Sequence, residues 1–152
     1  MTTFSITVDI PAPANRVWAV LVDVERWPEW TPTVTRLERF DHGPLVVGSR
    51  VRIWQPRLPP AIWRVTELRE GHSFTWISRS PGLAVVAEHA VEGAPDGSRA
   101  RLSVGFTGWL GPLFARLTRR LTERYLTLEA KGLGERSIAS TAPDPSAGNG
   151  AA

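Results

Sequence analysis

Histidine is the side chain best suited to acid–base chemistry near neutral pH, and this 152-residue chain contains three of them. His42 and His72 fall in predicted turns, whereas His89 lies in a predicted strand, on the face that alternation turns inward. His89 is therefore our candidate catalytic residue, as a hydrogen-bond partner or general acid–base group for a ligand carbonyl. The alternative is an interior histidine that bonds to a backbone carbonyl or to a helix side chain.

Two further polar side chains, Gln55 and Ser78, are predicted on the same inward face as His89. Three polar groups on an otherwise apolar surface are typical of a pocket for a small molecule. Both residues end their predicted strands, where a shift of one residue would reverse the face. The alternative is that Gln55 and Ser78 are simply hydrated.

Large apolar and aromatic side chains would supply the walls of such a pocket, or else the plain packing of a core. A buried tyrosine hydroxyl normally finds a partner, so Tyr125 is also expected to orient a ligand. Trp27 and Trp30 are expected mainly to fix a short helix, with Trp30 included among the ligand contacts. The wall residues that we predict to bind ligand are Trp30, Trp76, Phe106, Phe114, Leu117, Leu121 and Tyr125.

The absent residue types and motifs exclude several classes of chemistry. The chain has no cysteine, which excludes disulfides, thiol catalysis and thiolate metal sites. It contains no glycine-rich phosphate loop, G-x-S-x-G elbow or H-E-x-x-H motif, so we expect no metal and no cofactor. The net charge is +3, and the basic residues are spread over several predicted strands rather than gathered in one stripe. This distribution argues against nucleic acid as a partner.

The N-terminal segment combines a strand with helical turns. Hydrophobic residues at positions 4, 6, 8 and 10 alternate with polar ones, which predicts a half-buried strand. A helix is predicted over residues 14–24, where Val17, Leu21 and Val24 share one face. The sequence Trp-Pro-Glu-Trp at residues 27–30 ends this helix and predicts a second short helical turn.

Residues 34 to 108 switch to strands separated by turns, as in an antiparallel meander. The pair Asp96-Gly97 predicts a tight hairpin whose turn needs a positive φ. Alternation assigns an inward face to four of the strands and leaves the faces of 34–41 and 62–70 undecided. The predicted strands are residues 34–41, 49–55, 62–70, 73–80, 83–93 and 98–107.

The C-terminal part is predicted to be helical and then unstructured. Leucine and aromatic residues recur at helical spacing from Leu110 to Leu128, which predicts one long amphipathic helix. Gly132 and Gly134 are predicted to end it. Residues 137–152 are rich in alanine, serine, proline and glycine, and we expect them to be disordered.

This order of elements, together with several local motifs, resembles the SRPBCC superfamily of START-like and polyketide cyclase/dehydrase-like helix-grip proteins. The resemblance implies an α+β fold over residues 3–136, in which a curved seven-stranded antiparallel sheet grips a long C-terminal helix. It also implies two short helices between strands 1 and 2, and a cavity between the sheet and the long helix. The motifs are Ile10-Pro11-Ala12-Pro13 with Val17-Trp18, the corner from Asp23 to Trp30, Gly48-Ser49-Arg50-Val51, Phe74-Thr75-Trp76 and Gly111-Pro112-Leu113.

Three hypotheses about function remain open. The leading one is binding of a hydrophobic or amphipathic small molecule, such as a polyketide, lipid or isoprenoid-like compound, in that cavity. The second is a polyketide cyclase/dehydratase-like enzyme that uses His89 as its acid–base group, so the sequence leaves open whether the protein is an enzyme. The third is a protein-interaction module without small-molecule chemistry that acts through exposed tryptophans or the arginine-rich face, since Trp54, Trp63 and Trp109 have no evident core role.

No secretory signal or membrane-spanning segment is visible in the sequence. The N-terminus lacks a basic and an apolar region, and the longest strongly apolar run covers only residues 17–22. We therefore expect a cytoplasmic protein, monomeric or homodimeric, that does not insert stably into membranes.

Overall fold

A strand, two short helical segments, six further strands and two helices follow each other along the chain. The computed structural model describes residues 1–139. No helix in that range combines the length and the apolar character needed to cross a membrane. The elements are β1 (Thr2–Ile10), α1 (Ala14–Val22), the 3-10 helix η1 (Val24–Glu29), β2 (Arg36–Arg39), β3 (Arg50–Trp54), β4 (Ala61–Arg69), β5 (Ser73–Ser80), β6 (Leu83–Ala94), β7 (Gly97–Thr107), α2 (Gly111–Leu117) and α3 (Arg119–Ala139).

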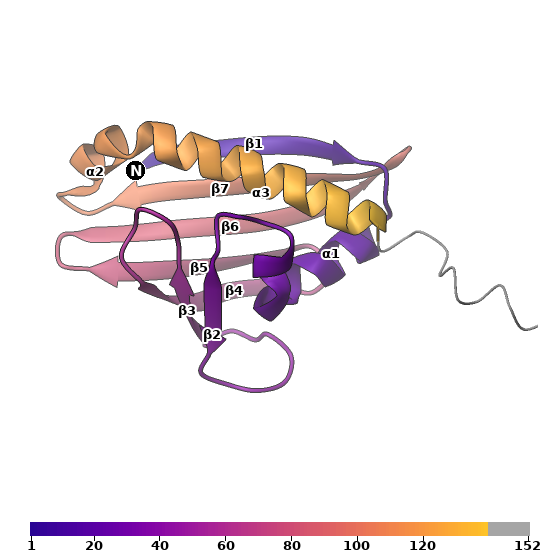
Figure 1. The fold of residues 1–152 in the computed structure, drawn as a ribbon, viewed down its shortest axis with the longest axis horizontal. Helices are drawn as coiled ribbons and strands as arrows, with labels where there is room; N and C mark the ends of the chain where they lie inside the picture. The colour runs from indigo at the N-terminus through magenta and orange to yellow at the C-terminus, as the bar shows by residue number, and fades with distance from the viewer. Residues whose placement is uncertain (140–152) are drawn as a thin grey trace, which may run out of the picture.

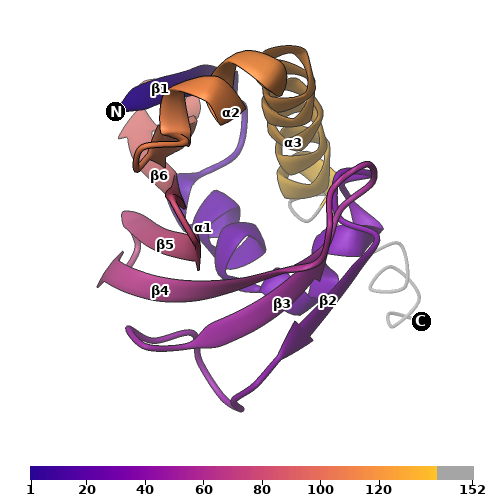
Figure 2. The same ribbon diagram turned by 90° about the vertical axis from the view of Figure 1, so that its left-hand side faces the viewer.

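The seven strands form one antiparallel sheet in the order β1-β7-β6-β5-β4-β3-β2. The sheet is strongly curved, and α3 lies across its inner side, where it packs on β1, β7 and α1 (Figure 1). Seen from one end, the strands curl round from β1 to β2 with α3 between the two edges (Figure 2). The predicted helix-grip fold, with two short helical segments between the first two strands, is therefore confirmed.

Alternation along the strands decides which side chains face the inside of the curved sheet. Val51 of β3 and both Phe74 and Trp76 of β5 are buried, as their inward parity predicts. The face of β4 could not be assigned from its sequence because a β-bulge between Val65 and Glu67 shifts the alternation within the strand.

The tight turn between β6 and β7 depends on a glycine. Gly97 has φ 145°, as predicted for the Asp96-Gly97 pair, in a region that favours glycine. A Cβ atom on Gly97 would also lie 2.3 Å from the carbonyl oxygen of Ile10, at the end of β1. This glycine therefore lets the hairpin turn press against the neighbouring strand end.

Helix α1 and η1 bury their apolar side chains against the sheet. Val17 and Leu21 of α1 are fully buried, and Val24 of η1 is almost so. The Trp27 indole donates a hydrogen bond to the Leu21 carbonyl oxygen at 3.0 Å. This bond fixes the corner between the two segments and holds the Trp27 ring 5.2 Å from the ring of Trp76, measured between centroids.

The C-terminal segment is two helices rather than the single helix that we predicted. Helix α2 ends at Thr118, whose N–H and hydroxyl both donate to the Phe114 carbonyl oxygen, at 2.9 and 2.7 Å. A threonine hydroxyl that bonds back to the preceding turn competes with regular helix geometry. The break at Thr118 means that α2 and α3 do not share one continuous apolar face.

The end of α3 also differs from the prediction. The helix continues through Gly132 and Gly134 and reaches Ala139, so residues 137–139 are helical rather than disordered. Burial explains the continuation, since Gly132 and Ser137 are both buried against the rest of the fold. The remainder of the predicted tail, residues 140–152, lies outside the described residues.

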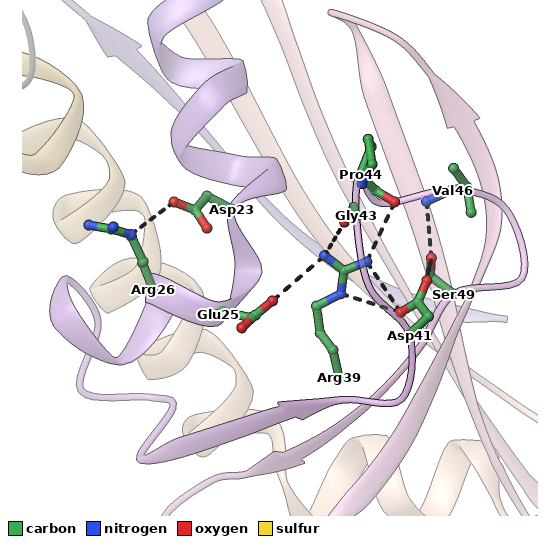
Figure 3. A network of polar contacts seen from close by, with 9 residues as sticks. All are labelled: Asp23, Glu25, Arg26, Arg39, Asp41, Gly43, Pro44, Val46 and Ser49. Carbon is green, nitrogen blue, oxygen red and sulfur yellow. Dashed lines mark hydrogen bonds and ion pairs between the residues drawn. The ribbon is translucent and has the colours of Figure 1, made fainter.

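A network of charged side chains fixes the loop between β2 and β3 and ties it to η1 (Figure 3). The Arg39 guanidinium lies 3.2 Å from the Asp41 carboxylate and 3.7 Å from that of Glu25. Asp41 also accepts a hydrogen bond from the Ser49 hydroxyl at 2.7 Å. That bond, together with the charge of Arg39, lowers the pKa of Asp41 below its usual value. We call Glu25, Arg39, Asp41 and Ser49 the β2–β3 loop network.

Candidate functional site

A cavity of about 740 Å³ lies between the inner face of the sheet and helices α2 and α3. Its lining comes from η1, from strands β3 to β7, from the β3–β4 loop and from the two C-terminal helices. Figure 2 shows these elements from one end, with the helices facing β4 and β5. A volume of this size is sufficient for a small organic ligand.

Aromatic side chains form much of the cavity wall. Trp76 of β5 lies 5.2 Å from Trp27 and 5.9 Å from Trp63 of β4, measured between ring centroids. Phe106 of β7 and Phe114 of α2 form a separate contact at 5.6 Å. All five residues line the cavity, which is therefore apolar over most of its wall.

His89 lies on the inner face of β6 and lines the cavity. The side chain is almost fully buried and stacks on Phe74 at 4.4 Å between ring centroids. Burial lowers the pKa of His89 to about 3, while an interaction with the Phe74 backbone acts in the opposite direction. Its Nδ1 atom has no hydrogen-bond partner among residues 1–139. At neutral pH His89 is thus an uncharged hydrogen-bonding group, and burial makes it a poor proton acceptor.

Gln55, Ser78 and Tyr125 contribute further polar groups to the lining. The Tyr125 hydroxyl donates a hydrogen bond to the carbonyl oxygen of Pro56 in the β3–β4 loop, and burial raises the pKa of Tyr125. Arg57 in the same loop has φ 67°, a left-handed conformation that is strained for a residue other than glycine. The bond from α3 therefore holds a strained loop in place at the cavity.

Glu129 of α3 is a lining residue that our sequence analysis did not select. Its Oε1 accepts a hydrogen bond from the Thr33 hydroxyl at 2.9 Å, and that hydroxyl lies 2.9 Å from the hydroxyl of Thr31. Burial raises the pKa of Glu129 to about 7, and the Thr33 hydrogen bond acts against this rise. The cavity therefore contains a carboxyl group that exchanges its proton near neutral pH. We call Thr31, Thr33 and Glu129 the Glu129 relay.

Helical spacing is the signal that could have found Glu129. It follows Leu121 and Tyr125 at intervals of four residues, and residues four apart lie on one face of a helix. Because Leu121 and Tyr125 were both assigned to the cavity, the same face carries Glu129 into it.

The position of the Glu129 relay depends on a glycine one turn further along α3. A Cβ atom on Gly132 would lie 2.1 Å from the carbonyl oxygen of Trp30. Only glycine therefore allows α3 to approach the segment after η1 this closely. The close approach places Glu129 beside Thr33.

Two of the predicted ligand contacts lie outside the cavity. Leu117 is 74% exposed, because α2 ends at Thr118 and its last residues do not share the inner face of α3. Trp30 lines a separate hollow of about 200 Å³ beside α1. The other predicted contacts line the cavity and are Gln55, Trp76, Ser78, His89, Phe106, Phe114, Leu121 and Tyr125.

The three tryptophans without a predicted core role have different surroundings. Trp63 is a wall residue of the cavity. The Trp54 ring lies under the guanidinium of Arg36, at 4.6 Å, away from the cavity lining. Trp109 is 81% exposed at the start of α2. Of these three, Trp109 alone thus presents the free surface that the interaction-module hypothesis requires.

The arrangement limits the chemistry that the site can perform. Within residues 1–139, no group of three or more histidine and acidic side chains could hold a metal ion. The cavity offers an apolar enclosure, the uncharged His89 and a carboxyl group at Glu129. These groups can orient a small molecule and can exchange one proton with it.

Comparison with solved structures finds this fold in proteins of low sequence identity. A norcoclaurine synthase point mutant from Thalictrum flavum, in complex with a transition state analogue, is 14% identical with a TM-score of 0.73, over 93% of this chain and 96% of that one. The protein TTHA0849 from Thermus thermophilus is 20% identical with a TM-score of 0.70, over 93% of this chain and 100% of that one. BexL, a di-domain ARO/CYC protein of the BE-7585A biosynthetic pathway, is 17% identical with a TM-score of 0.70 over 94% of this chain, which spans only 48% of BexL.

The comparison of sequences goes beyond the fold. No curated protein matches the chain. The model of one protein family, described as polyketide cyclase / dehydrase and lipid transport, matches residues 1–137. That match covers every element of the sheet and almost all of α3. The chain therefore belongs to the polyketide cyclase/dehydrase and lipid transport family.

Proposed function

We propose that the protein binds a hydrophobic or amphipathic small molecule, a polyketide, lipid or isoprenoid-like compound, in the cavity between the sheet and α3. The observation that carries this proposal is the cavity itself, about 740 Å³ in volume, with aromatic walls and a few polar groups. An enclosed apolar space with convergent polar groups is the usual form of a small-molecule site. Membership of a family that includes lipid transport supports the same function.

The polar lining residues have distinct proposed roles in this function. His89 offers an uncharged nitrogen to a ligand, since Nδ1 has no partner within the described residues. Gln55 and Ser78 offer further hydrogen bonds from the ends of their strands. Tyr125 holds the β3–β4 loop, through which we propose that ligand enters. A cytoplasmic location and a monomeric or homodimeric state remain predictions.

The direct test is native mass spectrometry of freshly purified protein, followed by titration with the fluorescent apolar probe anilinonaphthalene sulfonate. We expect a copurified apolar compound or saturable probe binding. Val85→Trp should reduce probe affinity at least about tenfold, because Val85 lines the cavity and a larger side chain fills it. Ala19→Trp is the matched control, since Ala19 is exposed on α1, and it should bind as the wild type does. Absence of both ligand and probe binding in the folded wild type would refute the proposal.

A polyketide cyclase/dehydratase-like enzyme is the second candidate, and the Glu129 relay is the observation that favours it. A general acid–base group works best when its pKa lies near the working pH, which fits the value of about 7 for Glu129. The value of about 3 for His89 makes that residue a poor choice for the same role. With an identified substrate, Glu129→Gln should lower kcat at least about a hundredfold. An unchanged kcat in that variant would exclude this mechanism.

A further inference from the structure

Glu129 is a partly buried carboxyl group without a counter-charge among residues 1–139. Among residues 1–139, no arginine, lysine or histidine forms an ion pair with it or lowers its pKa. Arg57 and Arg79 line the same cavity without pairing with Glu129, and His89 is uncharged at neutral pH. A buried carboxylate is costly unless a cation compensates it. A bound ligand is the remaining source of that positive charge.

When Glu129 is ionised it can only accept, and the hydrogen atoms of the Glu129 relay then all point toward the carboxylate. The Thr33 hydroxyl has one hydrogen, which it donates to Glu129 Oε1. The Thr31 hydroxyl must therefore donate to Thr33, and it accepts from the Thr33 N–H at 3.3 Å. A chain of donors that ends on Oε1 stabilises the ionised carboxylate. The second oxygen, Oε2, is then left to accept a hydrogen bond from a donor on the ligand.

The aromatic wall suits a cation as well as an apolar group. Trp27, Trp63 and Trp76 line the same cavity as Glu129. The faces of indole rings attract ammonium groups and also bury the apolar part of a ligand. The site therefore combines a carboxylate acceptor with a wall that tolerates positive charge.

We propose that Glu129 makes the cavity selective for amphipathic ligands that carry a protonated amine. The ammonium group donates to Oε2, and the apolar part of the ligand lies against the tryptophans. This inference rests on the proposed function, because it names the class of ligand for the same cavity. The raised pKa of Glu129 supports it, since a cation at Oε2 would favour the ionised form that burial now disfavours.

The test uses three probes that share one indole ring: tryptamine, its alcohol analogue tryptophol, and indoleacetic acid. Binding is measured by isothermal titration calorimetry at pH 8, where tryptamine is protonated and most of Glu129 is ionised. Wild-type protein should bind tryptamine about tenfold more tightly than tryptophol, because a charged hydrogen bond is stronger than a neutral one. Indoleacetic acid should bind most weakly of the three.

Two variants assign the preference to the carboxylate. Glu129→Gln keeps the shape and the acceptor for Thr33 but removes the charge, so tryptamine and tryptophol should then bind within about twofold of each other. Glu135→Gln makes the same change at an exposed position of α3 outside the cavity lining and should keep the tenfold preference. The ratio of tryptamine affinity to tryptophol affinity is measured on the wild-type protein itself, so the inference stays testable even if Glu129→Gln fails to fold.

The outcomes separate this inference from the function on which it rests. Equal binding of tryptamine and tryptophol by the wild type, or a preference that persists in Glu129→Gln, would overturn the amine selectivity and leave cavity binding intact. Absence of binding by all three probes and by anilinonaphthalene sulfonate would overturn both.

Discussion

Two carboxylates in this molecule have opposite surroundings. Asp41 in the β2–β3 loop network accepts a hydrogen bond from Ser49 and lies against the guanidinium of Arg39, and its pKa is lowered (Figure 3). Glu129 in the cavity has one hydroxyl donor and no cationic partner within the described residues 1–139, and its pKa is raised to about 7. The same functional group is therefore compensated in one region and left uncompensated in the other.

The difference separates residues that hold the fold from residues that are available to a ligand. A loop that must keep its shape gains from a carboxylate whose partners are all supplied by the protein. A cavity gains specificity from a polar group whose hydrogen-bond or ion-pair partner is supplied only by the bound ligand. His89 belongs to the second class, because its buried Nδ1 also lacks a partner within residues 1–139.

The largest expected effect comes from separating α3 from the segment after η1. Gly132→Ala would bring a Cβ atom within 2.1 Å of the Trp30 carbonyl oxygen, so the helix or the segment after η1 must move. We expect a loss of about 3 kcal/mol or more in the free energy of unfolding, measured by urea denaturation.

Gly134→Ala is the matched control for this helix. A Cβ atom there would meet only a side-chain carbon of Ile10, at 3.9 Å, which is an ordinary contact. Alanine favours helix over glycine by about 0.5–1 kcal/mol, so this variant should be as stable as the wild type or more so. Equal stability of Gly132→Ala and the wild type would show that α3 does not depend on the close approach.

The next effect is the pH dependence that Glu129 gives to stability. Between pH 4.5 and about 7 the Glu129 carboxyl group stays protonated in the folded protein but is ionised in the unfolded chain. The free energy of unfolding of the wild type therefore falls as the pH rises through this range. The difference between the ordinary pKa of 4.5 and the folded value of about 7 corresponds to about 3 kcal/mol in the free energy of unfolding at pH 8. Glu129→Gln should therefore be more stable than the wild type by up to this amount at pH 8 and equally stable at pH 4, in urea titrations.

Asp41→Asn should change stability at high pH in the opposite direction to Glu129→Gln. The folded pKa of Asp41 is lowered, so its contribution is present above the ordinary value of 3.8 and is lost as the pH falls through the folded pKa. The free energy of unfolding of the variant should be lower by about 1.5 kcal/mol at pH 7, the lower end of the range for hydrogen bonds to charged groups. Shifts of the same sign for Asp41→Asn and Glu129→Gln at high pH would contradict the contrast.

The effect expected at His89 lies between those at Glu129 and Asp41. Its folded pKa of about 3 lies below the ordinary 6.5, so wild-type stability falls as the pH drops below 6.5. Between pH 6.5 and 5 this loss is about 2 kcal/mol. Glu129 changes stability in the opposite direction over this pH range, so the measurement uses the Glu129→Gln background. His89→Leu should remove the loss there, so that denaturation midpoints at pH 7 and pH 5 lie closer together than in Glu129→Gln alone. An unchanged difference would mean that the imidazole can be protonated within the folded state.

Most of the fold could be predicted because its strands bury one face. Strict alternation fixed the inward positions of β5, where Phe74 and Trp76 are buried. Prediction of the buried face from the sequence failed where the alternation is interrupted, as at the bulge after Val65 in β4. Prediction of the helices also failed at Thr118, where the helical pattern is broken, and at Gly132, where close packing against Trp30 accompanies a helix that continues through a glycine predicted to end it.

The cavity was predicted better in its walls than in its chemistry. Strand parity brought His89 and Trp76 into the lining, since each strand position has only two possible directions. Glu129 was missed because charged residues on a helix are usually solvated, and only its spacing from Tyr125 indicated otherwise. The Thr33 partner lies in an irregular segment, so its contact with α3 depends on tertiary packing that no local pattern encodes.

The Glu129 carboxyl group lies in the cavity without a cationic partner among residues 1–139, and its pKa can be measured in the folded protein. Carbon-13 NMR of protein with labelled glutamate side chains can follow the Glu129 carboxyl carbon against pH, with Glu129→Gln to assign its signal. We predict a pKa of about 7 in the free protein and a lower value in the presence of tryptamine. A carboxyl group that titrates near the ordinary 4.5 without ligand, or whose titration tryptamine leaves unchanged, would contradict the account.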